Sequence, residues 1–271
     1  MIIHLLLGSI VGVILALTGA GGGILAVPLL IFGAHLGMVQ AGPIGLMAVG
    51  LAAAIGAVLG LRAGTVRYKA AALIATAGMI ASPIGLWLAQ HTPNRPLTGL
   101  FAVVLLFAAY RMYQKAASST TQTIQSVPTG HDLPPCRFDA TIGMLNWTMP
   151  CARALTLAGT VAGLLSGLLG VGGGFVVVPA LQRFTDLTPQ SVLATSLAVI
   201  ALVSVSGVIA SAAGGQLSWI VAFPFSAAAI AGMLGGRLVS ARLAGPQLQK
   251  TFAVISALVA MALIAKAALG N

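Results

Sequence analysis

Hydrophobic residues fill eight long segments of the chain, and short polar stretches separate these segments. The segments run over residues 2–34, 39–61, 70–90, 97–114, 154–182, 191–213, 216–241 and 248–269. Apolar runs of this length are typical of membrane-spanning helices. Residues 115–151 interrupt the series with a stretch rich in Ser, Thr and Pro, which we interpret as a polar linker. The pattern predicts an all-α polytopic membrane protein with four segments on each side of the linker.

The two groups of four segments are copies of one another. A shift of 151 residues superposes them without a gap. The matching pairs include Gly12 and Gly163, Gly56 and Gly207, Gly85 and Gly236, and Phe101 and Phe252. We therefore expect a first transmembrane repeat at residues 1–114, the linker at 115–151, and a second repeat at 152–271. In membrane transporters, such duplications commonly build the two sides of a central substrate site.

Composition supports a membrane location. Of the 271 residues, 59% are apolar and only 6% are charged, compared with about 25% charged residues in an average soluble domain. The net charge of +10 could suggest nucleic acid as a partner, but the Lys and Arg residues occur singly in short loops, as in membrane proteins. We expect the lipid bilayer as the surroundings and no nucleic-acid partner. The amino end has no basic region or cleavage site, so we keep its apolar run as mature structure.

Each copy begins with a segment that is too long for one straight membrane helix. A helix over residues 2–34 would measure about 50 Å, whereas the hydrocarbon core is about 30 Å thick. The segment contains GAGGGILAVPLL at residues 19–30, and its copy contains GVGGGFVVVPAL at residues 170–181. Adjacent glycines weaken a helix interior by about 1 kcal/mol each, and proline removes a hydrogen-bond donor. We therefore expect structural breaks at Gly19, Pro28, Gly170 and Pro179.

The basic residues distinguish a segment that crosses the membrane from one that turns back. If all eight segments crossed the membrane, eight Lys and Arg residues would lie on one side and the other five on the opposite side. If the first and fifth segments are re-entrant hairpins, eleven basic residues share one side, and only Arg95 and Lys266 lie opposite. The second arrangement agrees better with the excess of Lys and Arg in cytoplasmic loops. It predicts inverted repeats of three crossings each, with the linker at 115–151 in the cytoplasm.

Three consecutive glycines inside a membrane also suggest a binding site. They place backbone N–H groups at the start of a helix, where an unpaired donor costs several kcal/mol unless it faces protein or a wet cavity. Such amides attract anions, helped by the positive end of the following helix. Opposed half-helices of inverted repeats would direct both triplets at one central point. The expected substrate-binding residues are Gly21, Gly22, Gly23, Gly172, Gly173 and Gly174.

Glycines at four-residue spacing suggest a different role. Two such series precede the triplets: Gly8, Gly12 and Ala16, and their counterparts Gly159, Gly163 and Gly167. Small residues at this spacing allow membrane helices to approach closely. We therefore expect these positions to be helix-packing contacts.

The motifs identify a family. The paired G-x-G-G-G-x-x-x-x-P strings, the duplicated halves, and the strings TPQSVLATSL at 188–197 and GGQLSW at 214–219 resemble the sulfite exporter TauE/SafE family of membrane permeases. The resemblance covers the whole chain except the linker. It implies transport of a small sulfur-containing anion, such as sulfite or an organosulfonate, across the bacterial inner membrane. Members of the family differ in substrate and in direction of transport.

Three further side chains are candidates for contact with such an anion. Thr195 and Ser196 fall on Ile44 and Gly45 of the first half, so hydroxyl donors would come mainly from the second half. Helix–helix hydrogen bonding is the alternative role for both. Arg237 could attract anions at the cytoplasmic mouth, and the alternative is an arginine that snorkels to the membrane surface.

The remaining reactive side chains do not suggest an enzyme. The three acidic residues, Asp132, Asp139 and Asp186, all lie in loops, so the membrane segments contain no carboxylate for a proton relay. Cys136 and Cys151 are interpreted as free thiols, because no His or Cys spacing typical of a metal site accompanies them. We expect no catalytic residue, no metal, no cofactor, and transport without a carboxylate relay. Export of a monovalent anion could run on the membrane potential alone, and the sequence leaves the direction of transport open.

Two alternatives stay open. In a sodium- or other cation-dependent carrier, carbonyl groups at the helix breaks would hold the cation; the amide-rich turns and the lack of membrane carboxylates argue against it. In a non-transport membrane subunit, the glycine motifs would be structural. The sequence is compatible with a homodimer.

Overall fold

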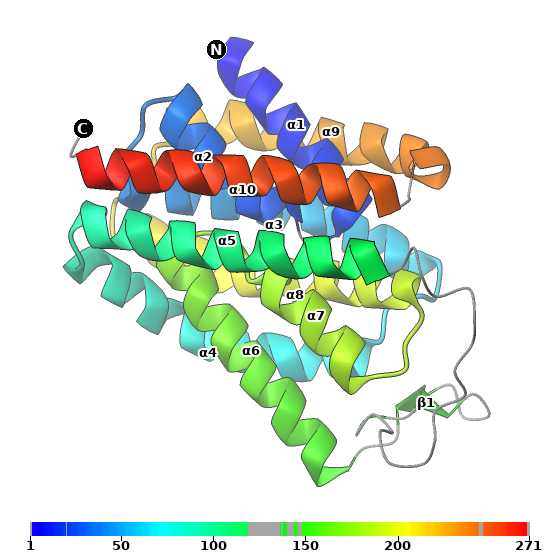
Figure 1. Ribbon diagram of the computed structural model, residues 1–271. Coiled ribbons are helices and arrows are strands. Elements are labelled where there is room, and N and C mark those ends of the chain that lie inside the picture. Colours follow the sequence, from blue (N-terminus) through cyan, green and yellow to red (C-terminus); the bar gives the residue numbers. More distant parts are fainter. Residues whose placement is uncertain are drawn as a thin grey trace.

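Helices make up nearly all of the structure, a computed structural model that describes residues 2–19, 21–118, 136, 138–139, 144–145, 148–243 and 246–269. Within these residues it contains ten α-helices and one short antiparallel ladder (Figure 1). The helices are α1 (Ile2–Thr18), α2 (Gly21–Gly33), α3 (Met38–Arg62), α4 (Tyr68–His91), α5 (Asn94–Ser118), α6 (Met149–Leu169), α7 (Gly174–Phe184), α8 (Pro189–Ala213), α9 (Trp219–Leu243) and α10 (Pro246–Leu269). The ladder joins β1 (Phe138–Asp139) to β2 (Met144–Leu145). The prediction of a helical protein is confirmed, with this ladder as a small addition.

Within the described residues, six helices are long and apolar enough to cross a membrane: α3, α4, α5, α6, α8 and α9. Large apolar side chains such as Ile80, Trp87 and Phe107 lie exposed on these helices, with 74%, 58% and 60% of their surface accessible. Such exposure is unfavourable in water, whereas lipid tails are as apolar as the side chains themselves. The prediction of a multi-pass membrane protein is confirmed.

The helices of the two halves correspond in pairs that lie 151 residues apart. The bounds of α3 and α8 differ by this number at both ends. Packing follows the same correspondence, because α4 packs against α6 as α1 packs against α9. α3 lies along α8 in the opposite direction, with Gly50 beside Ser204 and Gly60 beside Ala194. Figure 1 shows that the neighbouring helices α5 and α10 also run in opposite directions.

The glycines at four-residue spacing bring these helix pairs together, as predicted. A methyl group on Gly163 would overlap the backbone of Gly78 in α4, and one on Gly12 would overlap the carbonyl of Ala229 in α9. Close backbone approach of this kind is how small residues stabilise helix pairs in membranes.

The first apolar segment of each half consists of two helices. α1 ends at Thr18 and α2 begins at Gly21, whereas α6 ends at Leu169 and α7 begins at Gly174. The two helices of the first segment fold back on each other, because Gly22 lies beside Leu15 near the turn and Gly33 lies beside Leu7 at the far end.

The two prolines correct part of our prediction. Pro28 lies inside α2 and Pro179 lies inside α7, so neither is a structural break. A proline removes only one helix hydrogen bond, and membrane helices tolerate this when neighbouring groups satisfy the released carbonyl. The chain changes direction at the glycines instead.

Cys136 and Cys151 form a disulfide, which corrects our interpretation of both as free thiols. Their Cα atoms are 5.1 Å apart, within the usual range for a bridge. The amide of Cys136 donates a hydrogen bond of 3.1 Å to the carbonyl of Phe184, the last residue of α7. Cys151 lies in the first turn of α6. Sequence spacing did not reveal the bridge, because it depends on the chain before α6 reaching the end of α7.

Most of the predicted linker lies outside the described residues. At its borders, α5 continues to Ser118, past the expected end of the first repeat at residue 114, and α6 begins at Met149.

Candidate functional site

Two glycine-rich turns form the centre of the candidate site. We call residues 19–23 the first tip and residues 170–174 the second tip. Gly19 and Gly170 both have a φ of +70°, which places each in the left-handed conformation just after a helix end. Glycine reaches this conformation without a steric cost, so it commonly ends helices.

Helices α3 and α8 hold the tips. Gly170 lies against Gly42 of α3, so closely that a methyl group on it would overlap the Gly42 backbone. Gly19 lies against the side chain of Leu193, the residue of α8 that corresponds to Gly42. The tips also touch each other, because a methyl group on Gly23 would overlap the carbonyl of Val171. The structure therefore brings the two predicted glycine triplets together inside the helix bundle.

The two tips differ in conformation although their glycine patterns match. In the first tip, Gly21, Gly22 and Gly23 already belong to α2. In the second tip, Gly172 and Gly173 have φ values of +76° and +68°, and α7 begins only at Gly174. Among the described residues, the amides of Gly172, Gly173 and Gly174 donate no hydrogen bond to a backbone carbonyl. The second tip thus presents unbonded N–H groups at the positive end of an eleven-residue helix.

Thr195 and Ser196 are fully buried in α8, and both hydroxyl groups have protein partners. The Thr195 hydroxyl accepts a hydrogen bond of 3.1 Å from the amide of Arg67, which precedes α4. The Ser196 hydroxyl donates one of 2.8 Å to the carbonyl of Leu193. The Thr195 bond links α8 to the start of α4, which corresponds to the helix–helix role that we considered as its alternative, whereas the Ser196 bond lies within α8.

Arg237 is half-buried in α9. Its guanidinium group donates a hydrogen bond of 3.2 Å to the carbonyl of Gly56 in α3. The neighbouring Gly236 lies against Val13 and Ala16, in the second half of α1. Arg237 therefore connects α9 to α3 beside the helix that leads to the first tip.

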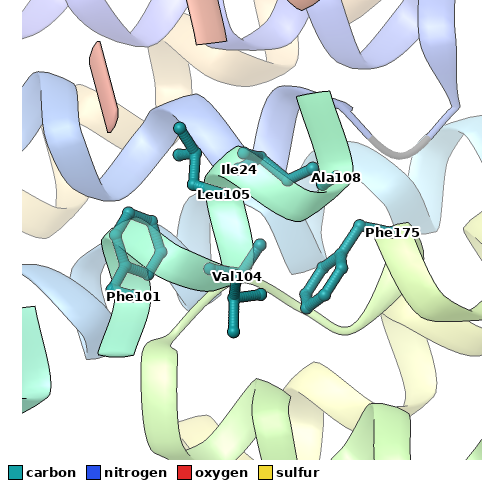
Figure 2. A pocket seen from close by; sticks show the side chains of 7 residues that line it. Ile24, Phe101, Val104, Leu105, Ala108 and Phe175 are labelled. Atoms are coloured by element: carbon teal, nitrogen blue, oxygen red, sulfur yellow. The ribbon is translucent and has the colours of Figure 1, made fainter. Parts of the chain in front are cut away.

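A small cavity lies beside the contact between the tips (Figure 2). Its walls come from α2, α5, the second tip and α7, and they include Ile24, Phe101, Val171 and Phe175. All of the lining residues are apolar. In this structure the tips are packed together, and an anion could reach their amides only after they separate.

Sequence reasoning missed a set of serine hydroxyls. Five buried serines have no hydrogen-bond partner among the described residues: Ser82, Ser166, Ser204, Ser226 and Ser256. Two of these serines lie at the second tip. The Oγ of Ser204 is 3.7 Å from the position of a methyl group on Gly172, and the carbonyl of Ser166 accepts a hydrogen bond of 2.8 Å from the amide of Gly170. The one signal in the sequence is a difference between the two halves, because the polar Ser204 corresponds to the apolar Ala53.

Comparison with known proteins identifies the family of this architecture. A family model described as sulfite exporter TauE/SafE matches residues 4–263. The chain belongs to the TauE/SafE family. This match confirms the resemblance inferred from the glycine motifs, and it indicates a membrane transporter and not an enzyme.

Curated relatives of this TauE/SafE protein are similar over most of their length. A probable membrane transporter protein named YunE from Bacillus subtilis is 25% identical over 248 residues, covering 89% of this chain and 87% of the relative. A probable membrane transporter protein from Xylella fastidiosa is 26% identical over 269 residues, covering 95% and 92%. No solved structure gives a significant match to the chain.

Proposed function

We propose that this TauE/SafE protein transports a small sulfur-containing anion, such as sulfite or an organosulfonate, and binds it at the two glycine tips near the middle of the membrane. The observation that carries the proposal is the set of unbonded amides at Gly172–Gly174, inside the bundle and in contact with the first tip. Backbone N–H groups at a helix start are a common anion site in proteins, and transporters use half-helix ends in the same way.

The arrangement of the helices supports a carrier with inverted repeats. Equivalent helices run antiparallel, as in α3 with α8. In inverted-repeat transporters, one repeat rocks against the other around a site at their interface. In this proposal, each glycine hairpin opens toward one side of the membrane, and the contact between Gly23 and Val171 separates when the anion enters.

Membrane topology and driving force complete the proposal. In this proposal the protein lies in the inner membrane of a bacterial cell with its linker in the cytoplasm, which the eleven basic residues expected on the linker side support. A monovalent anion that leaves an inside-negative cell gains roughly 2.3 kcal/mol per 100 mV, which can drive export without a proton relay.

Flux into proteoliposomes tests the function. We expect sulfite or an organosulfonate to move in response to a potassium–valinomycin voltage and to be insensitive to a pH gradient. Empty liposomes are the control. Flux that requires sodium would favour the cation-dependent carrier, and purified protein that moves no sulfur anion under any gradient would favour a non-transport subunit.

A further inference from the structure

The two tips carry the same glycine pattern in different surroundings. We propose that the anion is held at the second tip and not equally by both, that the Ser204 hydroxyl binds it together with the amides of Gly172–Gly174, and that it carries a single negative charge. This inference rests on the proposed function and assigns the residue and the charge state that select its substrate.

The Ser204 hydroxyl is a buried hydrogen-bond donor that is unsatisfied within the described residues. Its side chain is 2% exposed, and its Oγ has no hydrogen-bond partner in the described part of the chain. Other serines of α8 avoid this state, because Ser206 and Ser211 donate to carbonyls of their own helix, Val203 and Gly207 respectively. An unsatisfied buried hydroxyl costs about 1–3 kcal/mol. A ligand that accepts its hydrogen bond removes that cost.

The Ser204 hydroxyl lies beside Gly172, the first glycine of the second triplet. Its Oγ is 3.7 Å from the position of a methyl group on Gly172. It lies on the inner side of α8, because it also contacts Gly50 of the antiparallel α3. One oxyanion can therefore accept hydrogen bonds from the hydroxyl and from the start of α7 at the same time.

The first tip lacks the hydroxyl. Ala53, the counterpart of Ser204, has no donor in its side chain. The backbone also differs. Gly22 and Gly23 lie in the first turn of α2, where amides likewise have no acceptor within the helix, whereas Gly172 and Gly173 are left-handed and precede α7. The amides and the hydroxyl coincide only at the second tip, and this difference points to an unequal site.

The donors at the second tip are neutral, which limits the charge that the site can accept. The atoms nearest to Gly172 belong to Ile200, Val49 and Ser204, and those nearest to Gly173 belong to Ala162, so none is from Lys or Arg. The cost of burying an ion rises steeply with its charge, and neutral donors compensate a single charge far better than two. Hydrogen sulfite or a sulfonate therefore fits this site better than sulfate.

Binding to purified protein in detergent tests the inference. Titration calorimetry with hydrogen sulfite, methanesulfonate and sulfate is applied to the wild type, Ser204→Ala and Ser226→Ala. Ser226 is the matched control, because it is also buried and unpartnered but lies in α9 beside Phe225, which packs on the first half of α1 at Gly8. We expect Ser204→Ala to weaken binding of the monoanions about 10- to 100-fold, as for a hydrogen bond to a charged group, and Ser226→Ala to leave it unchanged.

The thermal stability of the ligand-free variants separates a binding role from a structural one. Both substitutions remove an unsatisfied hydroxyl, so neither should lower the melting temperature without ligand. Only Ser204→Ala should reduce the rise in melting temperature that the ligand produces.

The possible outcomes test three separate claims: the assignment of Ser204, the charge of the anion and the proposed function. Wild-type affinity in Ser204→Ala, or an equal loss in both variants, overturns the assignment of Ser204 and leaves the proposed function standing. Sulfate binding as tightly as methanesulfonate overturns the single-charge requirement. A wild-type protein that binds none of the three anions overturns the proposed function, and the inference with it.

Discussion

Gly170→Ala tests the contact that positions the second tip. Gly170 has a φ of +70°, and the backbone of Gly42 occupies the space that a side chain on Gly170 would need. An alanine there incurs two costs: about 1–2 kcal/mol for a left-handed alanine, and about 1–3 kcal/mol for a methyl group forced against backbone that cannot rotate away. We therefore expect Gly170→Ala to lower the free energy of unfolding by about 2–5 kcal/mol.

Gly215→Ala is the matched control. Gly215 has a φ of +68°, and a methyl group on it would meet nothing within 4 Å. It should lose only the conformational part, about 1–2 kcal/mol. Both variants are unfolded by titrating SDS into mixed micelles, which gives the free energy of unfolding directly. Equal losses would refute the reasoning, because they would mean that the second tip does not touch α3.

Three further predictions concern the same elements. Arg237→Ala should raise the KM for the anion and Arg237→Lys should restore it; an unchanged KM in Arg237→Ala would show that the residue only anchors α9 on α3. Cys151→Ser removes the disulfide and should lower the free energy of unfolding of purified, oxidised protein by about 3 kcal/mol in an SDS titration, as for a closed loop of 15 residues. As the control, reduced wild-type protein should lose the same amount. No loss in the variant would show that the bridge does not form. A protease site inserted after Gln125 should be cut in inside-out vesicles and not in spheroplasts, and the reverse result would place the linker outside the cell. Because disulfides persist mainly in oxidising compartments, a linker outside the cell would favour the bridge and a cytoplasmic linker would favour the reduced thiols.

The sequence predicted the parts of the fold that depend on periodicity and repetition. The shift of 151 residues anticipated the correspondence between α3 and α8, and the series through Gly12 and Gly163 anticipated the helices that approach most closely. The two prolines were misjudged, because the same residue can end a helix in water and continue one in a membrane where neighbours satisfy the backbone.

The parts that the sequence did not predict depend on contacts between distant segments. Hydrophobic pattern alone does not tell which hydroxyl of α8 bonds within its own helix and which faces a neighbour, so Ser204 was overlooked in favour of Thr195. The partner of Arg237 is a carbonyl 181 residues away in the sequence. The disulfide and the different unwinding of the two tips likewise appear only when the chain is folded.

The contact between Gly23 and Val171 has an electrical consequence. Backbone meets backbone there, and apolar side chains line the neighbouring cavity, so this part of the bundle is packed and apolar. A voltage across a membrane protein falls mainly where conducting water is absent. The voltage would therefore fall across the packed region that contains the helix ends at the tips, and their partial charges would feel the field even with no anion bound.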